Sequence, residues 1–424
     1  MNPKKLVRKV LPDRGIRMAE EAYRKSRIYA LQSRYGFPTR GMRIIAVTGT
    51  NGKTTTCSFL NEIIKSAGYK TGVITTAYIE IAGKRQPNLT HRTVPLSSEL
   101  LQIFKKAKAK KVDFFILEAT SQALHQHKFS GFPIEVAVMT NLTQDHLDYH
   151  GTMERYAAAK ARLFDNYCKP DFVVLNRDDK WYQYFEDRSI GQELSYGKHP
   201  DSTLQLIKSK TSDDSTDLVV TYGSAKQAVT LPLPGEFNVS NALAAMTAAL
   251  AVGVSLEKAA GGISKVSAVA GRMQSIEAGQ PFKVYVDFAV SPDAIEKVLQ
   301  SLKSTAKGRV IIVFGATGDR DKGKRADMGK AAAKHADLIF LTDDETYTED
   351  PEVIRQAVYK GIVSAKGKAK TTIIADREEA IRAAFQAAKK SDVVLLAGIG
   401  HEDYRNMGGK KLPWNEAAVA KKYL

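Results

Sequence analysis

The chain has 424 residues, of which 43% are hydrophobic and 26% are charged, so it is long enough for two or three domains of ordinary globular composition. Its two cysteines, Cys57 and Cys168, exclude a disulfide framework and fit a reducing compartment. The sequence contains no run of 18 apolar residues and no signal peptide, so we expect a cytoplasmic protein.

Positive charge is concentrated at the start of the chain. The net charge is +17, and residues 1–43 carry twelve Lys or Arg against three acidic residues, a net of +9. Such a segment could meet an anionic substrate or an anionic membrane face, and the plain alternative is a solvated, loosely attached helix. No aromatic-interleaved RNA motif or zinc-finger spacing accompanies it, so we expect no nucleic-acid partner. We define residues 1–40 as a basic N-terminal arm, with a helix predicted over 16–32.

Residues 41–270 are predicted to form a central domain of the α/β class. Apolar segments of strand length alternate with segments of helical spacing, which predicts a mostly parallel sheet with helices on both faces. Residues 193–231 are richer in β-branched and turn residues and predict an antiparallel addition. The predicted strands are 43–48, 112–118, 134–139 and 171–175, and the predicted helices are 53–67, 97–110, 152–166 and 236–252.

A second alternating series begins near Gly271. It predicts a separate C-terminal domain over 271–424, Rossmann-like and doubly wound. The predicted strands are 283–287, 309–314, 337–341, 371–374 and 392–396, and the predicted helices are 292–304, 324–335, 351–364, 376–389 and 414–422.

The clearest chemical signal follows the first predicted strand of the central domain. It reads G-T-N-G-K-T-T over 49–55, a glycine-rich turn that leads into a helix, although Val47 stands where the common P-loop has a glycine. Glycines let backbone N–H groups approach phosphate, a helix N-terminus favours negative charge, and the lysine adds a full positive charge. A threonine hydroxyl directly after the lysine suits Mg²⁺. We therefore predict a P-loop-type ATPase domain that binds phosphates through Gly49, Thr50, Asn51, Gly52, Lys53, Thr54 and Thr55.

Acidic and histidine side chains follow two further predicted strands. Glu118 ends the apolar run V-D-F-F-I-L-E, and Asp145, His146 and Asp148 crowd the segment after 134–139. Ligands bind at the carboxyl ends of strands in open α/β sheets, so an acid there is a natural Mg²⁺ ligand beside a phosphate loop. A lone histidine is usually structural, but this density of polar groups indicates a site.

Seven segments follow one another between residue 43 and the C-terminus. They read V-T-G-T-N-G-K-T-T-T, T-N-L-T-Q-D-H-L-D-Y-H-G-T-M, A-A-A-K-A-R-L-F, L-P-G-E-F-N-V-S-N-A-L-A-A, A-G-R-M, F-G-A-T-G-D-R-D-K-G-K-R and G-I-G-H-E. In order and spacing they resemble the Mur ligase family, and most closely its MurE type, the UDP-N-acetylmuramoyl-tripeptide synthetases. Folylpolyglutamate synthases share the phosphate loop but are not expected to carry the other segments together.

The resemblance implies an ATP-dependent amide ligase with ATP and Mg²⁺ as cofactors. ATP would phosphorylate a carboxylate of UDP-N-acetylmuramoyl-L-Ala-D-Glu, and the amine of a free amino acid would capture the acyl phosphate, in peptidoglycan precursor synthesis. A carboxylate is a poor electrophile until phosphate turns one oxygen into a leaving group, so the protein mainly positions its partners and neutralises charge. We expect a monomer. The alternatives are a Mur-like ligase for a different carboxylate acceptor and a non-catalytic ATP-binding subunit.

The resemblance assigns the catalytic and metal-binding roles to five residues. Lys53 would hold the β- and γ-phosphates, while Thr54 and Glu118 would bind one Mg²⁺. His146 would bind a second metal. Lys160 matches the carbamylated lysine of the family, since a carbamate gives this side chain a carboxylate-like charge. Without the resemblance, Lys160 would be taken for a surface lysine on a helix.

The resemblance also assigns contacts to the three substrates. Because Arg272 and Asp287 of the C-terminal domain would close on ATP, the site would lie between domains and turnover would require closure. The nucleotide contacts are Asn238, Asn241, Arg272 and Asp287. The acceptor contacts are Thr93, Ser121 and Lys128, and the amino-acid contacts are Arg320, Asp344, Glu345, Gly398 and Glu402.

The N-terminal arm departs from the family pattern. Family members carry a longer N-terminal domain that holds the uridine diphosphate, whereas only residues 1–40 precede the central domain here. Two hypotheses follow: the arm attracts the diphosphate of the acceptor by charge, or it holds the enzyme in weak contact with a membrane surface.

The motifs expected to contact the amino acid also differ from the family pattern. In the family block D-Y-A-H-x-P, Val290 stands at the position of the histidine. The block D-N-P-R reads D-E-T-Y over 344–347. The arginine that would clasp the far carboxylate of diaminopimelate is therefore Tyr347. Glu345 and Glu402 would repel that carboxylate and attract an ammonium group, so we expect lysine or ornithine to be preferred.

Overall fold

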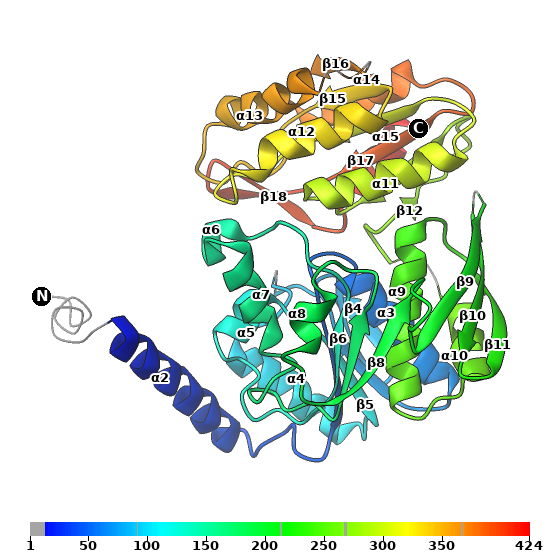
Figure 1. The fold of residues 1–424 in the computed structure, drawn as a ribbon. Coiled ribbons are helices and arrows are strands. Elements are labelled where there is room, and N and C mark those ends of the chain that lie inside the picture. Colours follow the sequence, from blue (N-terminus) through cyan, green and yellow to red (C-terminus); the bar gives the residue numbers. More distant parts are fainter. Residues whose placement is uncertain (1–12, 91, 213, 267–268, 366, 368) are drawn as a thin grey trace, which may run out of the picture.

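The computed structural model describes residues 13–424 except 91, 213, 267–268, 366 and 368, so the first twelve residues of the predicted basic arm lie outside the described residues. Two α/β units lie one above the other, and helix α2 (Asp13–Arg34) projects from the lower one at the left edge of the molecule (Figure 1). The predicted fold class, a mostly parallel central sheet followed by a doubly wound C-terminal sheet, is confirmed.

The lower unit is built on an eleven-stranded sheet in the order β11-β10-β9-β8-β7-β6-β1-β5-β2-β3-β4. Strands from β9 to β2 in that order pair in parallel, and antiparallel strands flank them on both sides. The strands are β1 (Arg43–Thr48), β2 (Thr71–Ile74), β3 (Tyr78–Ile81), β4 (Lys84–Pro87), β5 (Phe114–Glu118), β6 (Ile134–Met139), β7 (Phe172–Asn176), β8 (Gln192–Gly197), β9 (Leu204–Thr211), β10 (Thr216–Tyr222) and β11 (Ala225–Leu231).

Helices cover both faces of this sheet because successive side chains of each buried strand point to opposite sides. In β1, Ile45 and Val47 pack into the core under α3, α9 and α10, whereas Ile44 and Ala46 pack into the core under α4, α5 and α7. The helices are α3 (Lys53–Ser66), α4 (Ser97–Ala109), α5 (Ser121–His125), α6 (Leu147–His150), α7 (Met153–Ala161), α8 (Tyr182–Glu186), α9 (Glu236–Ala251) and α10 (Leu256–Ile263).

The upper unit is built on a six-stranded sheet in the order β12-β13-β17-β14-β15-β16, parallel except for the short edge strand β12. Helices α11, α12 and α13 cover one face, and α14 and α15 cover the other. The elements are β12 (Gln274–Ser275), β13 (Lys283–Asp287), β14 (Val310–Phe314), β15 (Leu338–Leu341), β16 (Lys370–Ile373), β17 (Val393–Ala397), α11 (Pro292–Thr305), α12 (Lys324–His335), α13 (Pro351–Ser364), α14 (Arg377–Ala387) and α15 (Glu416–Tyr423). A hairpin of β18 (Tyr404–Met407) and β19 (Lys410–Pro413) stands apart from this sheet.

The structure differs from the sequence prediction in several short elements. Strands β2, β3 and β4 were not predicted, because each has four residues and β4 is exposed along its length. Strand β8 pairs in parallel with β7 and β9, so the antiparallel addition begins at β9 and not at residue 193. The helix predicted over 152–166 ends at Ala161. Within the described part of the chain, no helix combines the length and the apolar character needed to cross a membrane.

Candidate active site

The phosphate loop connects β1 to α3 and passes close to two other segments. Gly49 and Gly52 both have positive φ, and a Cβ at either position would collide with the side chain of Thr140 or of Asn241. Glycine is therefore required by both backbone conformation and space. No described side chain caps the first turn of α3, so its N-terminus is available to an anion.

Lys53 and Glu118 both contact residues of this loop. The Lys53 ammonium donates to the carbonyl of Thr50 at 2.8 Å. Burial lowers its pKa, and the Glu118 carboxylate opposes that shift. Glu118, at the end of β5, is 2% exposed and accepts a hydrogen bond from the Thr54 hydroxyl at 2.9 Å. The backbone N–H of Thr76 donates to the same carboxylate at 2.9 Å.

The surroundings of the Glu118 carboxylate suit a hard cation. The Thr76 hydroxyl contacts both Glu118 and the Thr93 hydroxyl, the latter at 2.8 Å, so three hydroxyls gather around one buried acid. Oxygen ligands of this kind are those that Mg²⁺ prefers. No group of three or more His, Cys, Asp or Glu suited to a metal occurs among the described residues, so a cation here would also use phosphate or water ligands.

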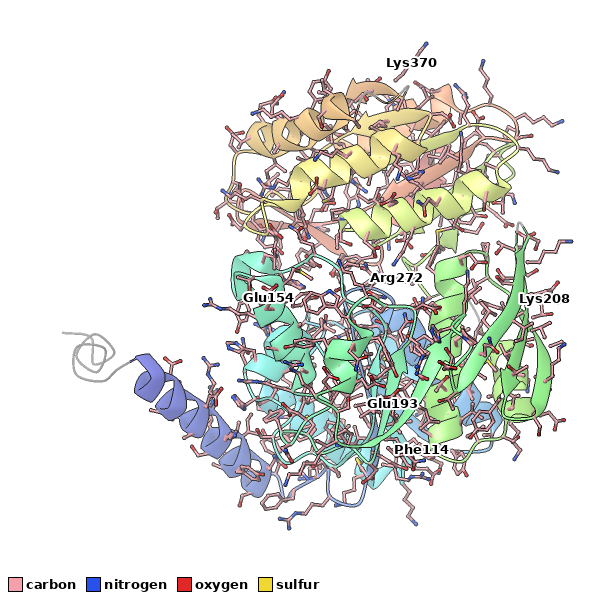
Figure 2. The ribbon with its side chains drawn as sticks, in the orientation of Figure 1. Phe114, Glu154, Glu193, Lys208, Arg272 and Lys370 are labelled. Atoms are coloured by element: carbon pink, nitrogen blue, oxygen red, sulfur yellow. The ribbon has the colours of Figure 1, made fainter. Side chains whose placement is uncertain are left out.

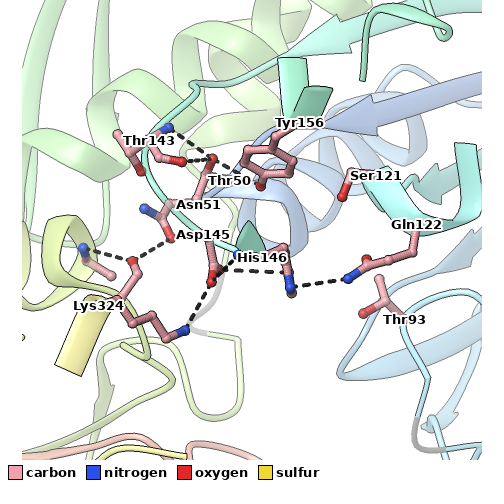
Figure 3. Close-up of polar contacts among 12 residues, drawn as sticks. Thr50, Asn51, Thr93, Ser121, Gln122, Thr143, Asp145, His146, Tyr156 and Lys324 are labelled. Atoms are coloured by element: carbon pink, nitrogen blue, oxygen red, sulfur yellow. Dashed lines mark hydrogen bonds and ion pairs between the residues drawn. The ribbon is translucent and has the colours of Figure 1, made fainter. Parts of the chain in front are cut away.

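A second group forms around His146 and Lys160, and Figure 3 shows His146 between Asp145 and Gln122. Lys160 is 1% exposed and donates to the carbonyl of Gly49 at 2.6 Å. Burial and the neighbouring Lys53 ammonium hold its pKa well below the usual value. His146 adopts a left-handed backbone conformation, and its Nδ1 lies 3.2 Å from the Gln122 amide nitrogen. The expectation of a surface lysine that residue type alone gives is therefore wrong for Lys160.

Tyr156 connects these groups. Its hydroxyl lies 3.3 Å from the Thr50 hydroxyl of the phosphate loop. The Lys160 ammonium lies 4.7 Å from the centre of its ring, and the His150 ring packs against it with centroids 5.2 Å apart. The side chain is 1% exposed and packs between Thr50 of the phosphate loop and the ring of His150.

The two units meet directly over the phosphate loop. The Lys324 ammonium, at the start of α12, donates to the Asp145 carboxylate at 3.0 Å. The Asn51 amide donates to Asp293, at the start of α11, at 2.8 Å. Arg272 lies between the units in Figure 2 and approaches the Thr54 hydroxyl at 3.4 Å. Residues of both units therefore enclose the same loop.

A cavity of about 730 Å³ opens beside the loop at this junction. Asn51, Gly52 and Thr55 line it on the loop side. Burial raises the pKa of Asp287, another lining residue, to about 6, and its carboxylate accepts from the backbone N–H of Met273 at 2.7 Å. The predicted nucleotide residues Asn238, Asn241, Arg272 and Asp287 all line this cavity. Residues that sequence reasoning missed here are Asn141, Asn176, Asp178, Tyr196, Phe237 and Lys297.

The three predicted acceptor residues contact different partners. Thr93 lies beside the Glu118 group through Thr76. The Ser121 hydroxyl lies 2.9 Å from Nε2 of the buried His150. The Lys128 ammonium is engaged by the carbonyls of Val94 and Pro95 at 3.2 and 3.1 Å, so it holds the Thr93 loop in place.

The predicted amino-acid residues form a separate group in the upper unit. Arg320 approaches the Tyr347 hydroxyl at 3.4 Å. Burial and the nearby Asp344 carboxylate raise the pKa of Glu345 to about 7, and burial also raises the pKa of Glu402.

Asp344 lies behind this group. It is 3% exposed, and a Cβ on Gly398 would collide with its carboxylate. The carbonyl of Asp344 accepts from Arg405 at 2.9 Å. The Asp344 carboxylate accepts from the backbone N–H of Glu345 at 2.7 Å, and Gly398 leaves room for that carboxylate.

Sequence reasoning also missed Thr76, Gln122, Tyr156 and Lys324, each of which touches a predicted residue. Gln122, Tyr156 and Lys324 lie in or next to recognisable motif segments, so proximity to them was an available signal. Thr76 follows a strand that was not predicted, so no signal in the sequence indicated it.

Comparison with known proteins gives consistent matches. Residues 47–249 match the Mur ligase middle domain, and residues 271–400 match the Mur ligase, glutamate ligase domain. A UDP-N-acetylmuramoyl-L-alanyl-D-glutamate–2,6-diaminopimelate ligase of Geobacillus kaustophilus is 41% identical over 395 residues, which cover 91% of this chain and 80% of that protein. A UDP-N-acetylmuramyl-tripeptide synthetase of Roseiflexus is 37% identical over 92% of this chain and 80% of its own length.

Solved structures agree in fold. A diaminopimelate ligase of the same description is 35% identical and superposes with a TM-score of 0.61 over 90% of this chain and 77% of its own. The folylpolyglutamate synthase of Mycobacterium tuberculosis, complexed with ADP and AMPPCP, gives a TM-score of 0.71 at 19% identity, covering 88% of this chain and 92% of its own. The latter likeness is one of fold alone.

Proposed function

Because this chain belongs to the Mur ligase family of ATP-dependent acid–amino-acid ligases, we propose that it adds an amino acid to UDP-N-acetylmuramoyl-L-Ala-D-Glu through an acyl phosphate, in peptidoglycan precursor synthesis. The observation that carries the proposal is the meeting of both units over the phosphate loop. There Lys53, Glu118 and Lys160 lie within one buried polar region beside a cavity of nucleotide size.

The proposed reaction proceeds in two steps, phosphoryl transfer and amide formation. A carboxylate oxygen of the acceptor attacks the γ-phosphorus of ATP, the bond to the β-phosphate oxygen breaks, and ADP leaves with that electron pair. The free amine then attacks the acyl carbon, phosphate leaves, and the amine gives up a proton. Lys53 and the N-terminus of α3 hold phosphate charge, and Arg272 closes over them from the other unit.

We assign Mg²⁺ to the Glu118 group and a second metal to the His146 group. Mg²⁺ would supply positive charge against the phosphates there. Glu118 and Thr54 would supply oxygen ligands to the first position, and their mutual hydrogen bond of 2.9 Å fixes both side chains. Gln122 holds the ring of His146 from its Nδ1 side.

We further propose that Lys160 is carbamylated. Carbamate formation needs a neutral amine, and the burial that lowers the pKa of Lys160 favours that form. The amine nitrogen bonds to the carbon of CO₂ and loses a proton, which leaves a carboxylate-like anion at the end of the side chain. That anion would replace a buried ammonium, whose charged form burial disfavours, by a group that can bind a metal.

For the incoming amino acid we propose a cationic side chain, lysine or ornithine. Several relatives are named as diaminopimelate ligases, and the proposed difference rests on the residues that this chain carries at the site. Glu345 and Glu402 are partly buried acids near Tyr347, and we assign Arg320, a cation that approaches the Tyr347 hydroxyl, to the α-carboxylate. A second carboxylate at the far end would meet like charge, whereas an ammonium would be attracted.

The pH dependence of amino-acid binding tests this assignment. Because the pKa of Glu345 is raised to about 7, its carboxyl is largely neutral at pH 6 and largely ionised at pH 8. We expect the KM for lysine to fall about tenfold between these values in the wild type and to change less in Glu345→Gln. The variant Glu277→Gln, at an exposed position of the same unit, is the control. Equal pH profiles for all three proteins, or a strong preference for diaminopimelate, would contradict the assignment.

The function itself is tested by measuring ADP release from ATP. We expect release only when UDP-N-acetylmuramoyl-L-Ala-D-Glu and an amino acid are both present with Mg²⁺. Release that requires a different carboxylate would point to another acceptor. ATP binding without release under any of these conditions would point to a non-catalytic subunit.

A further inference from the structure

Helix α2 is attached to the segment that carries the acceptor residue Ser121. The Glu21 carboxylate accepts from the Arg162 guanidinium at 2.6 Å. Nearer its C-terminus, the Gln32 amide donates to the carbonyl of Ser130 at 2.7 Å, and Ile28 is 5% exposed. The helix is therefore fixed to the loop after α5 by a buried amide, and its burial at Ile28 shows that it is not merely solvated.

Arg162 joins three segments through one guanidinium. Besides Glu21, it donates to the carbonyl of His125 at 3.2 Å and lies 3.0 Å from Nε2 of His127. It follows Lys160 by two residues, at the end of α7. Arg162 therefore ties α2 and the end of α5 to the helix that carries the buried lysine.

The protonation states of His127 and Glu21 fit the contacts that both make with Arg162. Burial and the nearby Arg162 lower the pKa of His127 to about 4, so the ring is neutral and its Nε2 can accept from the guanidinium. Burial raises the pKa of Glu21, but the hydrogen bond and charge of Arg162 outweigh it, and the net shift is downward. The pair is thus a carboxylate and a guanidinium at neutral pH.

We propose that α2 is a built-in brace of the acceptor subsite, in which Glu21 and Arg162 are positioning residues that hold segment 121–131 relative to Lys160. This inference rests on the proposed function, because it takes Ser121 and its neighbours as acceptor contacts. Through Gln32 the same helix also holds the far end of this segment, at the carbonyl of Ser130.

The brace differs in its consequences from simple charge attraction by a basic arm. Glu21→Gln and Glu20→Gln each remove one negative charge from α2. Glu20 is exposed and makes an ion pair with Arg24 at 3.6 Å, longer than the 2.6 Å contact of Glu21 with Arg162, so Glu20→Gln is a matched control. If the arm acted by charge alone, both variants would lower the KM for the anionic acceptor. The brace requires that only Glu21→Gln raise it.

The test measures the KM of ADP release for acceptor and for ATP in both variants. We expect Glu21→Gln to raise the acceptor KM about fivefold with the KM for ATP unchanged, and Glu20→Gln to change neither. An unchanged or lowered acceptor KM in Glu21→Gln would overturn the proposal.

Amide hydrogen exchange gives a second readout that needs no turnover. The amides of segment 121–131, several of which bond to carbonyls of α5 and its loop, should exchange faster in Glu21→Gln. Those of 43–56 should not change. Unchanged exchange over 121–131 would refute the brace. If the wild type releases no ADP with this acceptor, the proposed function fails, and the exchange result still decides the brace.

Discussion

Replacing Glu118 by glutamine is expected to lower kcat about a thousandfold without unfolding the protein. The amide has nearly the same size and can still accept from Thr54 and from the backbone N–H of Thr76. It loses the negative charge that we assign to Mg²⁺ binding, in a position that is 2% exposed and therefore weakly screened by water. The rate of ADP release at saturating substrates, measured over a range of Mg²⁺ concentrations, checks this expectation.

The variant Glu135→Gln is the control for this effect. Glu135 lies on β6, which β1 separates from the strand of Glu118, and pairs with Arg43 near the surface. Its replacement should leave kcat within about twofold of the wild type, because exposed ion pairs contribute little. If Glu118→Gln kept a rate similar to that of this control, the assignment of Glu118 would be wrong.

The second large effect is expected at Lys160. Lys160→Arg keeps a long cationic side chain, but a guanidinium stays protonated and does not take up CO₂. It would place a permanent positive charge beside the carbonyl of Gly49 and near Lys53. We expect kcat to fall about a hundredfold or more. The rate of ADP release and the intact mass of the wild type, compared with and without added bicarbonate, check this expectation.

Lys258→Arg is the matched control, since Lys258 is an exposed lysine on another helix of the same unit. It should have the activity of the wild type. A fully active Lys160→Arg, or a fully active wild type whose Lys160 carries no added CO₂, would contradict the carbamate proposal.

The long, regular helices and strands of this molecule could be predicted from the sequence. Strands such as β1 and β14 are buried on both faces and therefore read as continuous apolar runs, and α9 reads as an apolar helix ended by Gly253. The phosphate loop could be found because its glycines answer a local constraint, visible at Gly49 and Gly52.

Other features depend on contacts between distant segments and could not be found in this way. Lys160 is buried because α7 packs its last turn against the phosphate loop, a contact across 111 residues. Lys324 meets Asp145 from the other unit, across 179 residues. Neither pairing leaves a periodic or local signature, so the family resemblance indicated Lys160 and gave no partner for Lys324.

The arm shows the same limit. Its composition left open an anion-binding segment or a solvated, loosely attached helix, and the structure places Glu21, one of its few acids, against Arg162. The charge count of the arm therefore described its surface, while its attachment depends on an acid and on the buried Gln32.

The central claim is that an acceptor carboxylate is activated by phosphoryl transfer at the junction of the two units. It is tested most directly by supplying acceptor with ¹⁸O in that carboxylate and analysing the inorganic phosphate released during amide formation. The account predicts that one labelled oxygen appears in phosphate for each amide bond formed. Unlabelled phosphate, released while amide accumulates, would contradict it.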